Sequence, residues 1–146
     1  MRLISKATIQ IQKSTEEVFE GIVDPAKMTN YFISESNGRM ETGKDLIWKF
    51  PEFADQFPIT KIVIETNQSI SYVWDPKTIV NIVLEAQSDK STVVSVTENG
   101  KELNEENLKW LISNTAGWSN FLACLKAYLE YGVHLRKGAY DFMRKK

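Results

Sequence analysis

Few residues of this sequence are of the types that usually carry out chemistry. Its 146 residues include one histidine and one cysteine, and neither lies in a metal-ligand motif. No serine stands in a G-x-S-x-G motif, and no glycine-rich phosphate-binding loop occurs. The sequence therefore predicts no metal site, no cofactor and no recognisable set of catalytic residues.

Cys124 and His134 are better explained by structure than by catalysis. By helical periodicity Cys124 falls on the face opposite Leu122 and Leu125, with no basic neighbour there to lower its thiol pKa, so we interpret it as a small packing residue. His134 lies near the end of a predicted long helix, where a histidine is well placed against the helix dipole. A ligand or catalytic role is the less favoured alternative for it.

Carboxylates are the remaining candidates for acid–base chemistry. Glu98 ends a predicted strand on the side of Val94 and Val96, and Glu35 and Asp45 are two further acids in predicted strands. A carboxylate in an apolar pocket would have a raised pKa and could act as an acid or a base. The alternative, which we favour, is that each is a charge at the rim of the sheet.

Aromatic residues give the strongest signal for binding. By periodicity, a group of large rings from two strands and one helix points into the space between sheet and helix: Trp48, Phe50, Tyr72, Trp74, Trp118 and Phe121. Such rings either fill a core or line a cavity for a small molecule, with Asn114, Tyr72 and Glu98 as polar anchors. Both interpretations remain open.

Two phenylalanines stand in a segment that is expected to be a loop. Phe53 and Phe57 lie within residues 51–58, which are bounded by prolines. Apolar residues in a loop either cover something or stay exposed, so these two could form a lid over a cavity. Closing the end of the core is the favoured alternative.

A long C-terminal helix would position the helical members of these groups. Residues 110–131 have an uninterrupted helical period, with Leu122 and Leu125 on a wide apolar face. Asn104 is a suitable cap, and Glu105 and Glu106 suit the first turn. Gly117 could kink the helix or divide it, because glycine costs about 1 kcal/mol relative to alanine within a helix.

The rest of the chain has the period of short strands. A strand around residues 7–12 is followed by a helix that begins at the capping box Ser14-Thr15-Glu16-Glu17, and by a brief helix near residues 26–31. The remaining strands are predicted at residues 33–40, 45–50, 59–66, 69–75, 79–87 and 91–98. Tight turns join most of them, which predicts an antiparallel meander that Asn99-Gly100 ends.

Size and composition favour one soluble domain spanning residues 1–146. With 42% hydrophobic and 25% charged residues, the composition is ordinary for a globular protein. The net charge of -1 disfavours a nucleic-acid partner, although the basic run at residues 144–146 could contact phosphate. No apolar run is long enough for membrane insertion. The single cysteine and the absence of a signal-peptide pattern favour the cytoplasm.

The order of elements resembles the START-like superfamily, also called SRPBCC. Within it, the chain is similar to the group named after the activator of the heat-shock chaperone ATPase. Three places carry the resemblance: residues 14–19 running to Asp24-Pro25, the strand at residues 70–74, and Gly117-Trp118 leading into Leu122, Leu125-Lys126 and Tyr128-Leu129. Where this group commonly has Trp-Phe after the second helix, this chain has Tyr31-Phe32.

The resemblance implies an α+β helix-grip fold. Such a fold has a seven-stranded curved antiparallel sheet, two short helices and a long C-terminal helix, with a cavity between sheet and helix. Members of the superfamily bind lipids, sterols, polyketides or hormones, and some catalyse cyclisation or dehydration. One domain of the group stimulates a chaperone ATPase. No catalytic residue set is carried over to this chain.

These observations lead to three functional hypotheses. The first is a non-catalytic module that binds a small apolar or amphipathic ligand. Its predicted binding residues are Trp48, Phe50, Phe53, Phe57, Tyr72, Trp74, Glu98, Asn114, Trp118, Phe121, Leu122 and Leu125. The second is a protein-interaction module with a chaperone or another protein as partner. The third is a cyclase- or hydrolase-type enzyme with Glu98 as its base. Both a monomer and a homodimer are compatible with the sequence.

Overall fold

Seven antiparallel strands form one sheet in the order β1-β7-β6-β5-β4-β3-β2. The computed structural model describes residues 1–144, so Lys145 and Lys146 of the predicted basic run lie outside the described residues. The strands are β1 (Arg2–Ile11), β2 (Glu35–Ser36), β3 (Leu46–Lys49), β4 (Gln56–Glu65), β5 (Ser69–Val73), β6 (Ile79–Ala86) and β7 (Thr92–Glu102). The helices are α1 (Thr15–Val23), α2 (Pro25–Met28), α3 (Glu105–Tyr131) and the short 3-10 helix η1 (Asp141–Met143). The seven-stranded helix-grip fold is confirmed.

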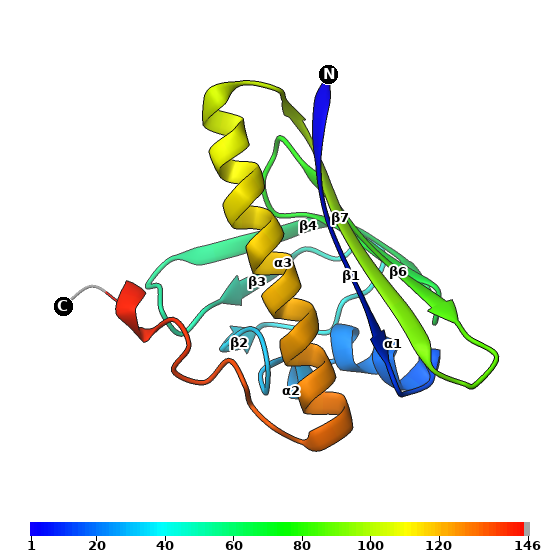
Figure 1. Ribbon diagram of the computed structural model, residues 1–146. Helices are drawn as coiled ribbons and strands as arrows, with labels where there is room; N and C mark the ends of the chain where they lie inside the picture. Colours follow the sequence, from blue (N-terminus) through cyan, green and yellow to red (C-terminus); the bar gives the residue numbers. More distant parts are fainter. Residues whose placement is uncertain (145–146) are drawn as a thin grey trace.

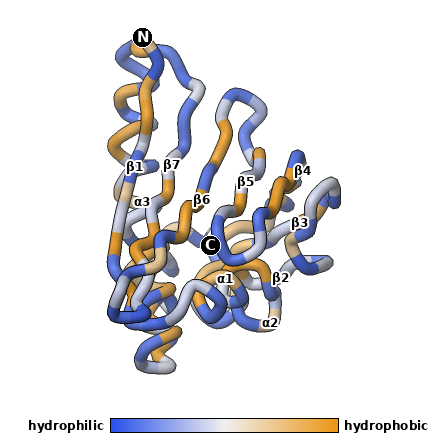
Figure 2. The backbone as a smooth tube through the Cα atoms, turned by 90° about the vertical axis from the view of Figure 1, so that its right-hand side faces the viewer, coloured by the Kyte–Doolittle hydropathy of each residue, from blue (hydrophilic) through white to orange (hydrophobic). Residues whose placement is uncertain are grey.

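The helix α3 lies across the sheet and packs most closely along β1 (Figure 1). Hydrogen bonds along its length hold the two together: Ser5 Oγ lies 3.1 Å from Thr115 Oγ1, and Lys126 Nζ donates to the Gln10 carbonyl at 2.8 Å. Hydrophobic and hydrophilic residues alternate along the strands (Figure 2). This alternation gives the sheet one apolar face, which α3 covers.

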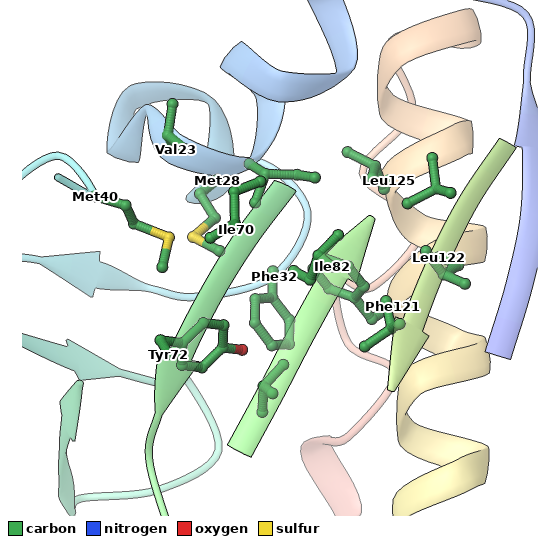
Figure 3. Close-up of a cluster of buried hydrophobic side chains, with 14 of the residues drawn as sticks. Val23, Met28, Phe32, Met40, Ile70, Tyr72, Ile82, Phe121, Leu122 and Leu125 are labelled. Atoms are coloured by element: carbon green, nitrogen blue, oxygen red, sulfur yellow. The ribbon is translucent and has the colours of Figure 1, made fainter. Parts of the chain in front are cut away.

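The core forms where the apolar side of α3 meets the sheet and the short helices. Figure 3 shows this cluster, in which Phe32 lies among side chains from β5, β6 and α3. Its labelled members are Val23, Met28, Phe32, Met40, Ile70, Tyr72, Ile82, Phe121, Leu122 and Leu125. Burial on this scale is the main favourable contribution to folding.

The two short helices begin where their capping residues predict. Ser14 Oγ accepts the amide of Glu17 at 3.2 Å, and Asp24 Oδ1 accepts the amide of Ala26 at 2.9 Å. Pro25 occupies the first turn of α2, where its missing N–H costs nothing. The second helix is shorter than predicted and ends at Met28.

Several strand boundaries differ from the sequence prediction. The strand expected at residues 33–40 is only Glu35–Ser36. The strand β4 begins at Gln56, so Phe57 belongs to a strand and not to a loop. Pro58 did not prevent this, although proline usually limits a strand. The predicted lid segment is therefore reduced to the residues before Gln56.

The last strand continues beyond the point where Asn99-Gly100 was expected to end it. The strand β7 extends to Glu102, and its pairing with β1 shifts register between Arg2 and Ile4. Gly100 takes up this irregularity with φ of 135°, which glycine adopts readily. The prediction of a strand end was wrong because the same dipeptide can form a bulge.

Gly117 does not divide the long helix in two, which was one of the two outcomes considered for it. The helix α3 is continuous from Glu105 to Tyr131, with Asn104 as its cap, as predicted. It ends at Gly132, which is left-handed with φ of 65°, so His134 lies beyond the helix. Within residues 1–144, none of the helices has the length and apolar character needed to cross a membrane.

The bulge at Gly100 leads to a stability prediction. A Cβ at this position would lie 2.1 Å from the Lys77 carbonyl oxygen, so Gly100→Ala should lower the free energy of unfolding by about 3 kcal/mol. Gly43 is the matched control, because its φ is also positive, at 80°, but nothing lies within 4 Å of an added Cβ. Urea denaturation should give a loss of only about 1 kcal/mol for Gly43→Ala. Equal losses would contradict the close approach.

Candidate functional site

A pocket of about 460 Å³ opens between α3, the sheet and the C-terminal segment. Its lining residues are Phe32, Phe50, Glu52, Phe53, Phe57, Trp74, Asp75, Glu98, Trp110, Ser113, Asn114, Gly117, Trp118, Asn120, Phe121, Arg136, Tyr140 and Met143. Glu98 is fully buried and marks the deep end, whereas Phe53 and Met143 are exposed and mark the mouth. Half of the lining residues are aromatic, and most of the others are polar or charged, a combination that small-molecule sites also use.

The Glu98 carboxylate at the deep end accepts hydrogen bonds from donors on both sides of the pocket. Oε1 accepts from Asn114 Nδ2 and Trp118 Nε1, each at 3.0 Å, and both residues are on α3. Oε2 accepts from Thr78 Oγ1 at 2.7 Å and from Trp74 Nε1 at 3.1 Å, next to β6 and β5. These bonds match the acceptor sites of an ionised carboxylate. Glu98 therefore links helix and sheet from inside the protein, and the favoured prediction of a charge at the rim was wrong for this residue.

This arrangement orients the two tryptophans of the pocket. The rings of Trp74 and Trp118 stack with centroids 5.2 Å apart and planes 27° apart. Because both indole N–H groups donate to Glu98, the rings have no donor left for a ligand. To the remainder of the pocket they offer carbon and π-electron surface.

Two buried polar atoms in this region have no hydrogen-bond partner within residues 1–144. They are Asn114 Oδ1 and Trp48 Nε1. The orientation of the Asn114 amide follows from Glu98, because the reverse orientation would bring two oxygen acceptors together. Asn114, unlike Trp48, lines the pocket. The unpaired acceptor therefore belongs to a residue of the pocket lining.

An ion pair holds the C-terminal segment, residues 133–144, over the mouth. Arg136 donates to both carboxylate oxygens of Glu52, at 2.6 and 3.1 Å, and the two side chains are 9% and 4% exposed. The guanidinium also lies over the rings of Phe50 and Tyr140, at 5.4 and 4.7 Å. In Figure 1 the red segment runs from the end of α3 back toward β3 and β4.

The predicted binding residues fall into two groups. Those that line the pocket are Phe50, Phe53, Phe57, Trp74, Glu98, Asn114, Trp118 and Phe121. The others lie buried in the packed core and do not line it: Trp48, Tyr72, Leu122 and Leu125. Burial raises the pKa of the Tyr72 hydroxyl well above its usual value, and the Glu98 charge adds to this shift, so Tyr72 stays neutral. Aromatic periodicity alone did not distinguish core from pocket.

Sequence reasoning missed ten of the lining residues, four of which lie on α3 and six outside it. They are Phe32, Glu52, Asp75, Trp110, Ser113, Gly117, Asn120, Arg136, Tyr140 and Met143. Helical periodicity could have identified Trp110 as a lining residue, since it lies one turn before Asn114 on the same helix. Arg136 had none, because it follows the helix in a segment without periodicity.

The other candidates for chemistry are not part of the pocket. Glu35 and Asp45 are exposed, and Glu35 pairs with Lys49 at 3.2 Å. Cys124 is fully buried in the core, so its predicted outward position was wrong, but its interpretation as a packing residue fits. Burial raises the pKa of the Cys124 thiol, against a smaller lowering by Arg136. Desolvation and the cations Lys137 and Arg136 lower the pKa of His134.

The acceptor sites of Glu98 are occupied by donors from the protein. The two other carboxylates of the lining, Glu52 and Asp75, form ion pairs with Arg136 and Lys101. Among residues 1–144, no group of three or more histidine, cysteine, aspartate or glutamate side chains could hold a metal ion.

Comparison with known proteins assigns the chain to a family. The model of the family described as Activator of Hsp90 ATPase homolog 1-like protein matches residues 12–130. The crystal structure of a protein from Staphylococcus saprophyticus is 33% identical, with a TM-score of 0.82 over 92% of this chain and 96% of that one. No curated protein matches this chain.

Two more distant structures share the fold. The Aha1 dimer from Colwellia psychrerythraea is 17% identical, with a TM-score of 0.75 over 89% of this chain and 98% of that one. DynU16, a protein of the dynemicin biosynthetic locus, is 22% identical, with a TM-score of 0.77 over 90% of this chain and 48% of that one.

The contribution of the hydrogen bond from Trp118 to Glu98 should be measurable as a difference in the free energy of unfolding. Trp118→Phe removes a donor to a buried carboxylate, whereas Trp48→Phe removes the same atoms from a fully buried indole whose N–H has no partner. We expect the free energy of unfolding in urea to fall by about 2 kcal/mol more for Trp118→Phe. Equal losses would show that Glu98 gains nothing from this donor.

The ion pair at the mouth predicts local opening in a variant that lacks it. Arg136→Gln leaves Glu52 buried without its partner, so the amides of residues 137–143 should exchange hydrogen faster. Arg144→Gln is the control in the same segment, since the ion pair of Arg144 with Asp141 is exposed. Unchanged exchange in Arg136→Gln would show that other contacts hold the segment.

Proposed function

The chain belongs to the family of Activator of Hsp90 ATPase homolog 1-like proteins, and from this premise we propose that it is a non-catalytic binding module. It holds a small apolar or amphipathic molecule, of which a lipid is one example, in the pocket beneath α3. The observation that carries the proposal is an aromatic pocket of about 460 Å³ with one fully buried carboxylate at its deep end.

The size and lining of the pocket support this function. Its volume lies within the range of about 300 to 1,000 Å³ that is usual for small-molecule sites. Phe50, Phe57 and Phe121 present apolar surface, which favours an apolar body. Glu98 and Asn114 supply fixed polar groups at one end, which favour a ligand with one polar end. The single cysteine favours a cytoplasmic location for such a module.

A protein-interaction module is the second candidate, and a different feature favours it. The amino-terminal part of α3 exposes Leu108 and Ile112, one turn apart, and Leu103 lies just before the helix. Exposed apolar side chains that lie together mark contact surfaces. If this surface contacts a chaperone or another protein, replacing Leu108 and Ile112 with glutamate should abolish capture of that protein in a pull-down, and pocket variants should not.

Native mass spectrometry tests the proposed pocket function. The purified protein should carry an added mass that organic extraction removes, and the extracted protein should bind decanol in calorimetric titration. The same spectra would report whether the chain pairs with a second copy. A bare protein mass together with no decanol binding would contradict the proposal.

A variant that fills the pocket tests whether decanol binds there. A Cβ at Gly117 meets no atom within 4 Å and Gly117 lines the pocket, so Gly117→Phe should direct a ring into the pocket. We expect it to weaken decanol binding about tenfold or more by removing apolar volume. Ala116→Phe is the matched control, since Ala116 is exposed on the same helix and does not line the pocket. Equal weakening by both variants would place the binding elsewhere.

A further inference from the structure

The deep end of the pocket holds a carboxylate that no cation neutralises within residues 1–144. Glu98 has no exposed surface, and its donors are two indoles, an amide and a hydroxyl, all of them neutral. None of the ion pairs of the described residues includes it. Hydrogen bonds from neutral groups spread the charge of a carboxylate but do not cancel it. The deep end is therefore electronegative.

The groups next to Glu98 also favour a positively charged ligand at the deep end of the pocket. Asn114 directs its N–H toward Glu98, and its oxygen is a buried acceptor without a partner in the described part of the chain. Trp74 and Trp118 direct their N–H edges, the positive side of the ring quadrupole, at the carboxylate. What remains for a ligand is ring surface and an oxygen, and both attract cations.

The cations around the pocket are already paired. Arg136 binds Glu52 through two hydrogen bonds near the mouth. Lys101 pairs with Asp75, another lining residue, at 3.2 Å. An anionic ligand would therefore have to break an existing ion pair and also approach Glu98. A neutral ligand could pair with Asn114 but would leave the charge of Glu98 as it is.

We propose that the ligand is a cationic amphiphile. Its apolar body fills the aromatic part of the pocket, and its amine or quaternary ammonium group lies against Trp74, Trp118 and the acceptor Asn114 Oδ1, close to Glu98. This inference rests on the proposed binding function and names the chemical class that the same pocket selects.

Three compounds with the same alkyl chain test the sign of this selection: decylamine, decanol and decanoate. At neutral pH they carry a positive, a zero and a negative charge, so their dissociation constants from calorimetric titration separate charge from apolar burial. We expect decylamine to bind about tenfold more tightly than decanol, and decanoate more weakly than decanol.

Each outcome of this comparison has a distinct meaning. Binding of decanol and decylamine with equal affinity would overturn the cationic preference and leave the pocket function standing. Tightest binding by decanoate would overturn the preference and point to Arg136 or Lys101 as the anchor. Binding of none of the three compounds would overturn both proposals.

A charge-removing variant assigns the preference to Glu98. If circular dichroism shows that Glu98→Gln folds, this variant should bind decylamine no more tightly than decanol, and its affinity for decanol should be unchanged. Glu85→Gln is the matched control, because Glu85 is exposed and does not line the pocket. If Glu98→Gln does not fold, the order of affinities of decylamine, decanol and decanoate in the unmodified protein tests the role of charge, and Gly117→Phe should weaken the binding of all three. An unchanged ratio in a folded Glu98→Gln variant would overturn the role of Glu98.

Discussion

A carboxylate buried between helix and sheet is the constraint on which the rest of this structure depends. Removing an ionised group from water costs several kcal/mol or more, so Glu98 is tolerated only where its oxygens have donors. Those donors come from the end of β5, from the turn before β6 and from α3. A helix shifted by one residue along the sheet would lose two of these bonds, because Asn114 and Trp118 lie one turn apart. Glu98 therefore helps to fix the position of α3.

The same hydrogen bonds help to explain why space remains beside this network. Large side chains in a core usually adjust until the voids between them disappear. Trp74 and Trp118 are restricted in this respect, since moving either ring into the pocket would break its bond to Glu98 and leave a buried acceptor unpaired. Trp48 has no such bond and packs edge-on against Tyr72 and Trp74 in the core. A hydrogen bond to Glu98 thus distinguishes Trp74 and Trp118, which line the pocket, from Trp48, which packs in the core.

Sequence patterns predicted the fold well because periodicity reports which side of an element is buried. They placed α1, the meander and α3, and they brought Glu98, Asn114 and Trp118 into one candidate site. They could not predict that Gly100 forms a bulge, because the bulge depends on the pairing of β7 with β1. Nor could they predict the pair of Arg136 with Glu52, which joins residues far apart in sequence and outside any periodic segment. Pocket shape depends on such contacts, whereas the fold does not.

The two charged features of the pocket act differently on a ligand. At the mouth, Arg136 and Glu52 neutralise one another, so their field falls off quickly with distance. At the deep end, Glu98 has only neutral donors, so its field extends along an apolar pocket where little water screens it. In the proposed complex, the charge of Glu98 would therefore attract a cationic group inward from the mouth. Because Glu98 also positions α3, the feature that would select a ligand is inseparable from the one that holds the fold together.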